Sequence, residues 1–255
     1  MSVVLASTWR PRGEMPRFQR LYARLMEVYD SLIIAVPFDI DPADLEEVNG
    51  LHRLDGVRIA IPPDRTRARY AAMRASLDTS AGHIHYVDMD RLLRWVETRP
   101  EELRQTVQAV VRADCLIIGR SAAALQTHPR SLQKTEAIVN AVFSHLLGQS
   151  VDLCSGSKGF SRRAAHFLIH NSSPGNWSNA EWPTLLHQAG FALRSVLVDG
   201  LDWESADRHR LQAADAESQR LLADEHDRDV EHWEFRVQAA LDIVREGLAA
   251  ARRSA

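Results

Sequence analysis

Short apolar runs alternate with longer amphipathic segments along most of this chain. Each run is followed by proline, glycine, serine or aspartate, which is typical of a buried strand that ends at a turn. The strands that this pattern predicts lie at residues 3–6, 32–36, 57–61, 83–87, 115–118 and 192–198.

The segments between these runs carry apolar residues at helical spacing, as Leu21, Leu25 and Val28 do. Asp41 can cap one such helix, and Pro42 suits its first turn. The helices predicted in this way cover residues 18–29, 41–48, 65–77, 100–111, 132–147, 164–170 and 182–189.

This alternation of strand and helix predicts an α/β fold in which helices flank a mostly parallel central sheet. From residue 206 onward the sequence is charged, helical in composition and free of proline up to residue 251. We therefore expect a main domain over residues 1–205 and a helical extension over residues 206–255. The extension could pack on its own domain or mediate a homodimer.

Three Asp-x-Asp triplets are candidate sites for a divalent cation. Asp88-Met89-Asp90 directly follows the predicted strand at 83–87, and ligands of parallel sheets bind beyond the carboxyl ends of the strands. Asp39-Ile40-Asp41 lies past Pro37 in a helix-capping position, and Asp227-Arg228-Asp229 lies in the charged helical extension. Position therefore favours the middle pair, which could hold a cation against a diphosphate.

Composition and short motifs argue against nucleic-acid binding, cysteine metal sites, secretion and a membrane span. The chain has 255 residues and 45% hydrophobic content, enough for a large core, and a net charge of -3 gives no reason to expect a nucleic-acid partner. Cys115 and Cys154 lie beside apolar residues without metal-ligand spacing, so we expect buried thiols. No signal peptide and no apolar stretch near the ~18 residues of a membrane span is present, so a cytoplasmic protein without a transmembrane segment is expected.

The segment from Asp88 to Val198 resembles family 2 glycosyltransferases of the GT-A fold. It is most similar to the dolichol-phosphate mannose synthase and polyprenyl-phosphate glycosyltransferase branch. Four elements carry the resemblance in the order of the family: the strand with VDMD, the ADCLIIGR strand, the run from Asn140 through LLG, VD and SG to FSRR, and the EWPTLL helix with AG and a strand after it. Asp207-Arg208-His209-Arg210 also faintly resembles the C-terminal R-x-H of glucosyl-3-phosphoglycerate synthases.

The resemblance implies a metal-dependent transferase that moves a hexose from GDP- or UDP-hexose to a small-molecule or lipid-phosphate acceptor. Mg²⁺ or Mn²⁺ would stabilise the leaving diphosphate. Asp88 and Asp90 would bind this metal, with His209 as a third ligand. The alternatives are that the two aspartates cap the next helix and that His209 is an ordinary surface residue.

The resemblance and the strand order also suggest roles for other residues. Glu181 is the candidate general base, although an acid at a helix start is also favoured by the helix dipole. Trp177, Trp182 and Trp203 could form a sugar platform or pack in the core. Candidates for the nucleotide sugar are Ser7, Thr8, Arg65, Arg69, Asp88 and Arg120. Candidates for the acceptor are Arg130, Ser155, Gly156 and Lys158.

Two other functions use the same fold and are weighed beside the first. A catalytically inactive nucleotide- or sugar-binding protein would keep the metal-dependent binding without transfer. A sugar nucleotidyltransferase would carry a Gly-rich, Arg-containing loop after the first strand, to which the stretch from Thr8 to Gly13 is a poor match.

Overall fold

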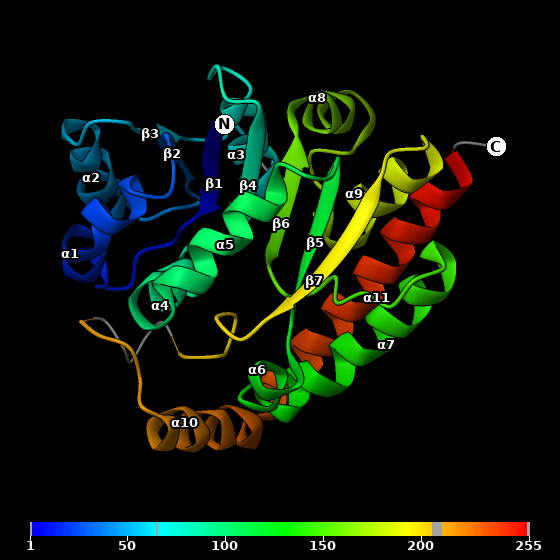
Figure 1. The fold of residues 1–255 in the computed structure, drawn as a ribbon. Coiled ribbons are helices and arrows are strands. Elements are labelled where there is room, and N and C mark those ends of the chain that lie inside the picture. Colours follow the sequence, from blue (N-terminus) through cyan, green and yellow to red (C-terminus); the bar gives the residue numbers. More distant parts are fainter. Residues whose placement is uncertain (1, 65, 206–210, 254–255) are drawn as a thin grey trace.

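The computed structural model describes residues 2–64, 66–205 and 211–253. Its centre is a seven-stranded sheet in the order β3-β2-β1-β4-β6-β5-β7 (Figure 1). All the strands are parallel except β6, which runs antiparallel between β4 and β5. The strands are β1 (Val3–Thr8), β2 (Ser31–Ala35), β3 (Val57–Ala60), β4 (His83–Val87), β5 (Cys115–Arg120), β6 (Ser157–Ser161) and β7 (Leu193–Val198). The prediction of a mostly parallel sheet flanked by helices is confirmed.

Strand β6 was not among the predicted strands, because its sequence SKGFS has no apolar run. It forms by pairing along both sides, with β4 and with β5. Since β6 is antiparallel, its first residue Ser157 pairs with Val87, the last residue of β4. The turn before β6 therefore lies at the same edge of the sheet as the carboxyl ends of the parallel strands.

Helices cover both faces of the sheet, because successive side chains of a strand point to opposite faces. Val3 and Leu5 of β1 pack on one face, and Val4 and Ala6 on the other. The first face carries α1 (Met15–Met26), α2 (Pro42–Asn49), α4 (Met89–Thr98) and α5 (Pro100–Val110) (Figure 1). The second carries α3 (Ala68–Ser76), α7 (Arg130–Leu147), α8 (Arg162–Asn171), α9 (Ser178–Gln188) and α11 (Val230–Arg253). Helix α4, the short α6 (Ala122–Gln126) and the 3₁₀ turn η1 (Gly50–Arg53) lie outside the predicted ranges.

The C-terminal segment forms two helices, α10 (Ala216–Arg228) and α11. Helix α11 packs along α9 and α7 and buries Ile243 and Ala250 in the core of the second face. A side chain at Gly247 would start 2.3 Å from the ring of Phe143, so the glycine permits this close packing. Within the described ranges, no helix has both the length and the hydropathy needed to cross a bilayer.

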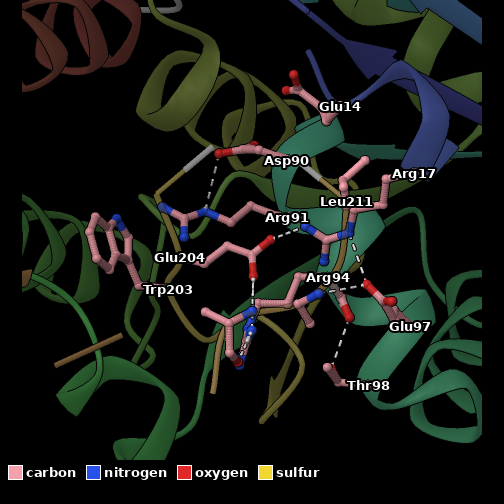
Figure 2. Close-up of polar contacts among 12 residues, drawn as sticks. Glu14, Arg17, Asp90, Arg91, Arg94, Glu97, Thr98, Trp203, Glu204 and Leu211 are labelled. Carbon is pink, nitrogen blue, oxygen red and sulfur yellow. Dashed lines mark hydrogen bonds and ion pairs between the residues drawn. The ribbon is translucent and has the colours of Figure 1, made fainter. Parts of the chain in front are cut away.

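A buried network of ion pairs joins α1 and α4 to the segment after β7. Arg17 bonds to Glu97 and Glu204, and Arg94 bonds to Glu204 and Asp202. Figure 2 shows Arg17 between the carboxylates of Glu97 and Glu204. Because Arg94 belongs to α4, the network fixes the helix whose first turn follows Asp88.

Candidate active site

Asp88 lies where β4 ends and α4 begins, at the carboxyl edge of the sheet. It occupies the N-cap position of α4, but its side chain makes no capping hydrogen bond. Instead its carboxylate accepts hydrogen bonds from Thr8 Oγ1 at 3.1 Å, from the Tyr86 hydroxyl and from Arg69 Nη2 at 2.8 Å. Three predicted residues are thus brought together: Thr8 from β1, Arg69 from α3 and Asp88 from the junction of β4 and α4.

Burial and charge shift the pKa of the two titratable partners of Asp88, Arg69 and Tyr86. Burial alone would lower the pKa of Arg69, but the charge of Asp88 raises it above the ordinary value. Burial raises the pKa of Tyr86 well above its usual value, so its hydroxyl remains a hydrogen-bond donor at neutral pH. Ser7, also predicted, is fully buried and donates to the carbonyl of Val87 at 2.7 Å, which ties the end of β1 to the end of β4.

The turn before β6 approaches Asp88 closely. The backbone N–H of Asp88 donates to the carbonyl of Gly156 at 3.1 Å. Gly156 has a φ of 80°, and a Cβ there would lie 2.5 Å from Asp88 Oδ2, so both its backbone and its missing side chain suit the site. Ser155 donates to the carbonyl of Ile118 at 2.6 Å, which fixes the turn to β5. Gly156 therefore lies beside the Asp88 carboxylate, and Ser155 lines the same cavity as Asp88.

Asp90 stands in the first turn of α4, with 37% of its side chain exposed. Arg91 Nε lies 4.0 Å from its carboxylate. Burial raises the pKa of Asp90, the charge of Arg91 opposes this effect, and the charge of Asp88 adds to it. A cation placed between the two aspartates would stabilise the charged form of this carboxylate.

Three cavities lie in this region, and two of them reach the aspartate pair. The strand-end cavity, about 620 Å³, lies beyond β1 and β2 and is lined by Thr8, Asp39, Arg69 and Trp177 among others. The helix-walled cavity, 290 Å³, is lined by Asp88 and Asp90 and closed by α7 and α11. The corner cavity, 530 Å³, lies at the turn between α10 and α11 and also reaches Asp90.

The strand-end cavity contains polar groups that sequence reasoning did not assign to a site. Arg10 and Asp39 form an ion pair of 2.6 Å, and the Arg67 guanidinium lies 4.2 Å from the ring centroid of Trp177. Asp41 caps α2 through the N–H of Ala43, as predicted, whereas Asp39 lines the cavity rather than capping the helix. The position of Asp39 just after the second strand was the available signal, because residues in that position reach the carboxyl edge of the sheet.

Two predicted cations lie in the interior, away from these cavities. Arg120 is 5% exposed; it makes paired hydrogen bonds to Asp152, at 2.7 and 2.8 Å, and an ion pair with Glu136. Lys158 is 4% exposed, and its ammonium donates to the carbonyl of Leu153 at 2.9 Å. In this structure both hold the segment that leads to the Ser155-Gly156 turn.

The buried Lys158 makes stability depend on pH. Burial lowers the pKa of Lys158 to about 8 from 10.5, so the unfolded chain binds the proton more tightly and the native state gains stability as pH rises between these values. Below pH 8, burying the charged ammonium lowers the stability of the native state by on the order of 3 kcal/mol.

We expect Lys158→Met to remove this dependence. The unfolding free energy of the variant minus that of the native chain should therefore be larger at pH 7 than at pH 10. Urea denaturation at both pH values measures this, with the exposed Lys134→Met as control; equal differences at the two pH values would contradict it.

Two other predicted residues are also engaged away from the aspartate pair. Glu181, in the first turn of α9, is fully buried and accepts from Arg253 at 2.6 Å, which joins α9 to α11. Arg130, the first residue of α7, has a 70% exposed side chain and bonds to Asp227. Asp227 also accepts the backbone N–H groups of Arg130 and Ser131 and so caps α7. Neither residue lines the three cavities.

Two further predictions, Arg65 and His209, fall outside the described residues. Within the described ranges, no group of three or more His, Cys, Asp or Glu side chains is arranged to hold a metal ion. The Asp88 and Asp90 carboxylates alone nonetheless suit Mg²⁺ or Mn²⁺, since Mg²⁺ is commonly held by one or two carboxylates together with substrate phosphates.

Comparison with known proteins relates this geometry to solved structures. Glucosyl-3-phosphoglycerate synthase from Mycobacterium tuberculosis, solved with Mn²⁺, UDP and phosphoglyceric acid, is similar over 92% of this chain and 78% of its own, with a TM-score of 0.52 and 12% identity. A mycobacterial protein is similar over 77% of this chain and 65% of its own, with a TM-score of 0.51 and 15% identity. No protein-family model and no curated protein sequence matches the chain. The likeness concerns the fold alone: the chain shares the arrangement of helices around a mixed central sheet with these two structures.

Proposed function

We propose that this chain is a metal-dependent glycosyltransferase that moves a hexose from a nucleotide-diphosphate sugar to an acceptor. One observation carries the proposal: Asp88 and Asp90 stand at the carboxyl edge of the sheet, where a 620 Å³ cavity beyond the strand ends adjoins a 290 Å³ cavity closed by helices. A donor could lie across this junction, with its nucleotide in the first cavity and its sugar in the second.

Asp88 and Asp90 would hold the Mg²⁺ or Mn²⁺ ion, which stabilises the negative charge that develops on the leaving diphosphate. Around them, the protein fixes the acidic pair before any ligand binds. Thr8 and Tyr86 donate to Asp88, and Arg69 pairs with it while donating to Asn179 at 2.7 Å. This pre-organisation reduces the cost of ordering the site when the donor binds.

The strand-end cavity is the proposed nucleotide site. Trp177 and the Arg67 guanidinium give it a stacked, partly apolar wall, and the Asp39 carboxylate can accept hydrogen bonds from N–H groups of a base. UDP and GDP are both compatible with such groups. The sequence resembles the dolichol-phosphate mannose synthase branch, so a lipid-phosphate acceptor and a small-molecule acceptor both remain within the proposal.

A thermal-shift screen of UDP, GDP and ADP with their sugars, with and without Mn²⁺, tests the proposal. A ligand at about 100 times its Kd stabilises the native state by about 2.7 kcal/mol. For a chain of this size that raises the Tm by roughly 5–10 °C. We expect one nucleotide to give such a shift, and to give it only in the presence of Mn²⁺. Absence of any metal-dependent shift would contradict the proposal.

Turnover assays separate the remaining alternatives. Transfer or slow hydrolysis of the bound donor supports the transferase. Metal-dependent binding without either reaction supports the inactive binding protein. Release of pyrophosphate from a nucleoside triphosphate and a sugar phosphate supports the nucleotidyltransferase.

A further inference from the structure

Two arginines from distant parts of the chain meet beside Asp90. Arg91 belongs to α4 and Arg236 to α11, and both line the helix-walled cavity and the corner cavity. Asp90 lines the same two cavities. Figure 2 shows the Arg91 side chain extending on the side of Trp203, away from the ion pairs of Arg17 and Glu97.

Both guanidinium groups have unused capacity to donate hydrogen bonds. Arg91 Nη1 is buried and has no hydrogen-bond partner among the described residues, and Arg91 Nε is 4.0 Å from Asp90. Arg236 Nη1 is likewise 4.0 Å from its ion-pair partner Glu136, which already pairs with Arg120 at 2.7 Å. A guanidinium offers five N–H donors, and the two ion-pair contacts of 4.0 Å within the described ranges are longer than hydrogen bonds, so both groups can donate to a ligand.

The electrostatic setting also favours an anion. Burial lowers the pKa of Arg236. The negative charge of Glu136 raises this pKa, whereas the positive charges of Arg91 and Arg120 lower it further. The side chains of Arg91 and Arg236 are 15% and 32% exposed, so solvent screens their repulsion incompletely. A phosphate or carboxylate between them would relieve the repulsion and accept paired hydrogen bonds, which the planar guanidinium favours.

We propose that Arg91 and Arg236 form an anion subsite for the second substrate, which binds from the corner cavity with a phosphate or carboxylate group. This inference rests on the proposed transferase function. Arg236 does not line the strand-end cavity, where the nucleotide is proposed to lie, whereas Arg69 lines both the strand-end and the helix-walled cavity. The donor diphosphate is therefore expected near Asp88 and Arg69, and the anion subsite lies beyond Asp90.

The rest of the corner cavity suits the body of a polar acceptor. His226 and His232 stack with ring centroids 3.9 Å apart, and Trp203 lies edge-on to His226 at 6.2 Å. The two imidazoles and the exposed carboxylate of Asp229 offer hydrogen-bond partners for hydroxyl groups. Under this proposal α11 is part of the substrate site and not only a covering helix.

Calorimetric titration of the full chain with inorganic phosphate and with malonate, in the presence of Mn²⁺, tests the subsite. We expect Arg91→Met and Arg236→Met each to weaken binding of at least one anion about tenfold, which corresponds to about 1.4 kcal/mol. Arg245→Met, an exposed arginine of the same helix, is the control and should bind as the native chain does. Circular dichroism would establish that the variants are folded.

Repeating the titration with saturating UDP or GDP identifies which substrate uses the subsite. We expect the anion to bind alongside the nucleotide, with nucleotide affinity in the variants unchanged. Displacement of the anion by the nucleotide would assign the arginines to the donor diphosphate and overturn the proposal. Anion binding equal in all variants, or absent from the native chain, would overturn it too. If no nucleotide binds, the proposed function fails, while loss of anion binding in the two variants still reports the subsite itself.

Discussion

Replacing Asp88 by asparagine should lower metal-dependent donor turnover on the order of a thousandfold, because the change removes about 4 kcal/mol of metal-mediated charge stabilisation in the transition state. The amide keeps the shape of the side chain and an acceptor oxygen for Thr8 and Tyr86. The substitution therefore removes the negative charge that would bind the metal and that pairs with Arg69. The variant should retain the native circular dichroism spectrum.

Asp90→Asn is expected to have an effect of similar size, since both carboxylates line the helix-walled cavity. Asp41→Asn is the matched control: Asp41 belongs to another Asp-x-Asp triplet and caps α2, and asparagine caps a helix about as well as aspartate. The measurement is donor turnover as a function of Mn²⁺ concentration, together with the Mn²⁺-dependent thermal shift. Native turnover in both Asp88→Asn and Asp90→Asn would exclude the metal site and, with it, the proposed mechanism.

The part of this site that sequence could predict is the part set by sheet topology. Apolar runs placed β1 and β4 in one parallel sheet, and parallel strands end at the same edge, so Thr8 and Asp88 were expected to lie near each other. Arg69 was expected there because it opens the helix after β3. These inferences rested on the order of strands and helices together with the family resemblance, not on the details of side-chain packing.

The interior cations show where that reasoning stops. Arg120 and Lys158 follow or belong to strand regions, as ligand-binding cations often do, yet both are buried with partners inside the protein. Asp152, the main partner of Arg120, is 32 residues further along the chain. Which charge pairs with which depends on three-dimensional packing, so sequence alone does not distinguish a substrate-binding arginine from one that supports a loop.

Strand β6 and Arg236 were missed for a related reason. The sequence SKGFS has no local strand signal; it becomes a strand because two neighbours supply hydrogen bonds and because Gly159 leaves room for Val110. Arg236 lies on a long charged helix where many arginines look alike. Only the packing of α11 along α7 and α9 brings this one beside Asp90.

The buried ion network leads to the second prediction of large effect: Arg94→Met should cost the native state about 3–5 kcal/mol, because it leaves the Asp202 carboxylate without its cation and Glu204 with Arg17 as its cationic partner. Arg94 donates to both oxygens of Asp202, at 2.7 and 2.6 Å, to Glu204 at 2.9 Å and to the carbonyl of Ala214 at 3.0 Å. Its side chain is 6% exposed, and that of Glu204 is 4% exposed. Burial lowers the pKa of Arg94, but the hydrogen bonds and charge of Asp202 raise it above its usual value. The pair therefore remains charged in the native state.

Urea denaturation and thermal melting measure this cost, which should lower the Tm by on the order of 10 °C. Arg104→Met is the control, because Arg104 pairs with Glu101 on the surface, where such pairs contribute about 1 kcal/mol or less. Asp202→Asn in the Arg94→Met background should recover part of the loss, since it removes the unpaired charge, and the double-mutant cycle then gives the coupling of the pair. A loss within about 1 kcal/mol of the Arg104 control would mean that water or Gln219, which also contacts Asp202, compensates for the missing guanidinium. In that case the network would not be what holds α4, and therefore Asp88 and Asp90, in position.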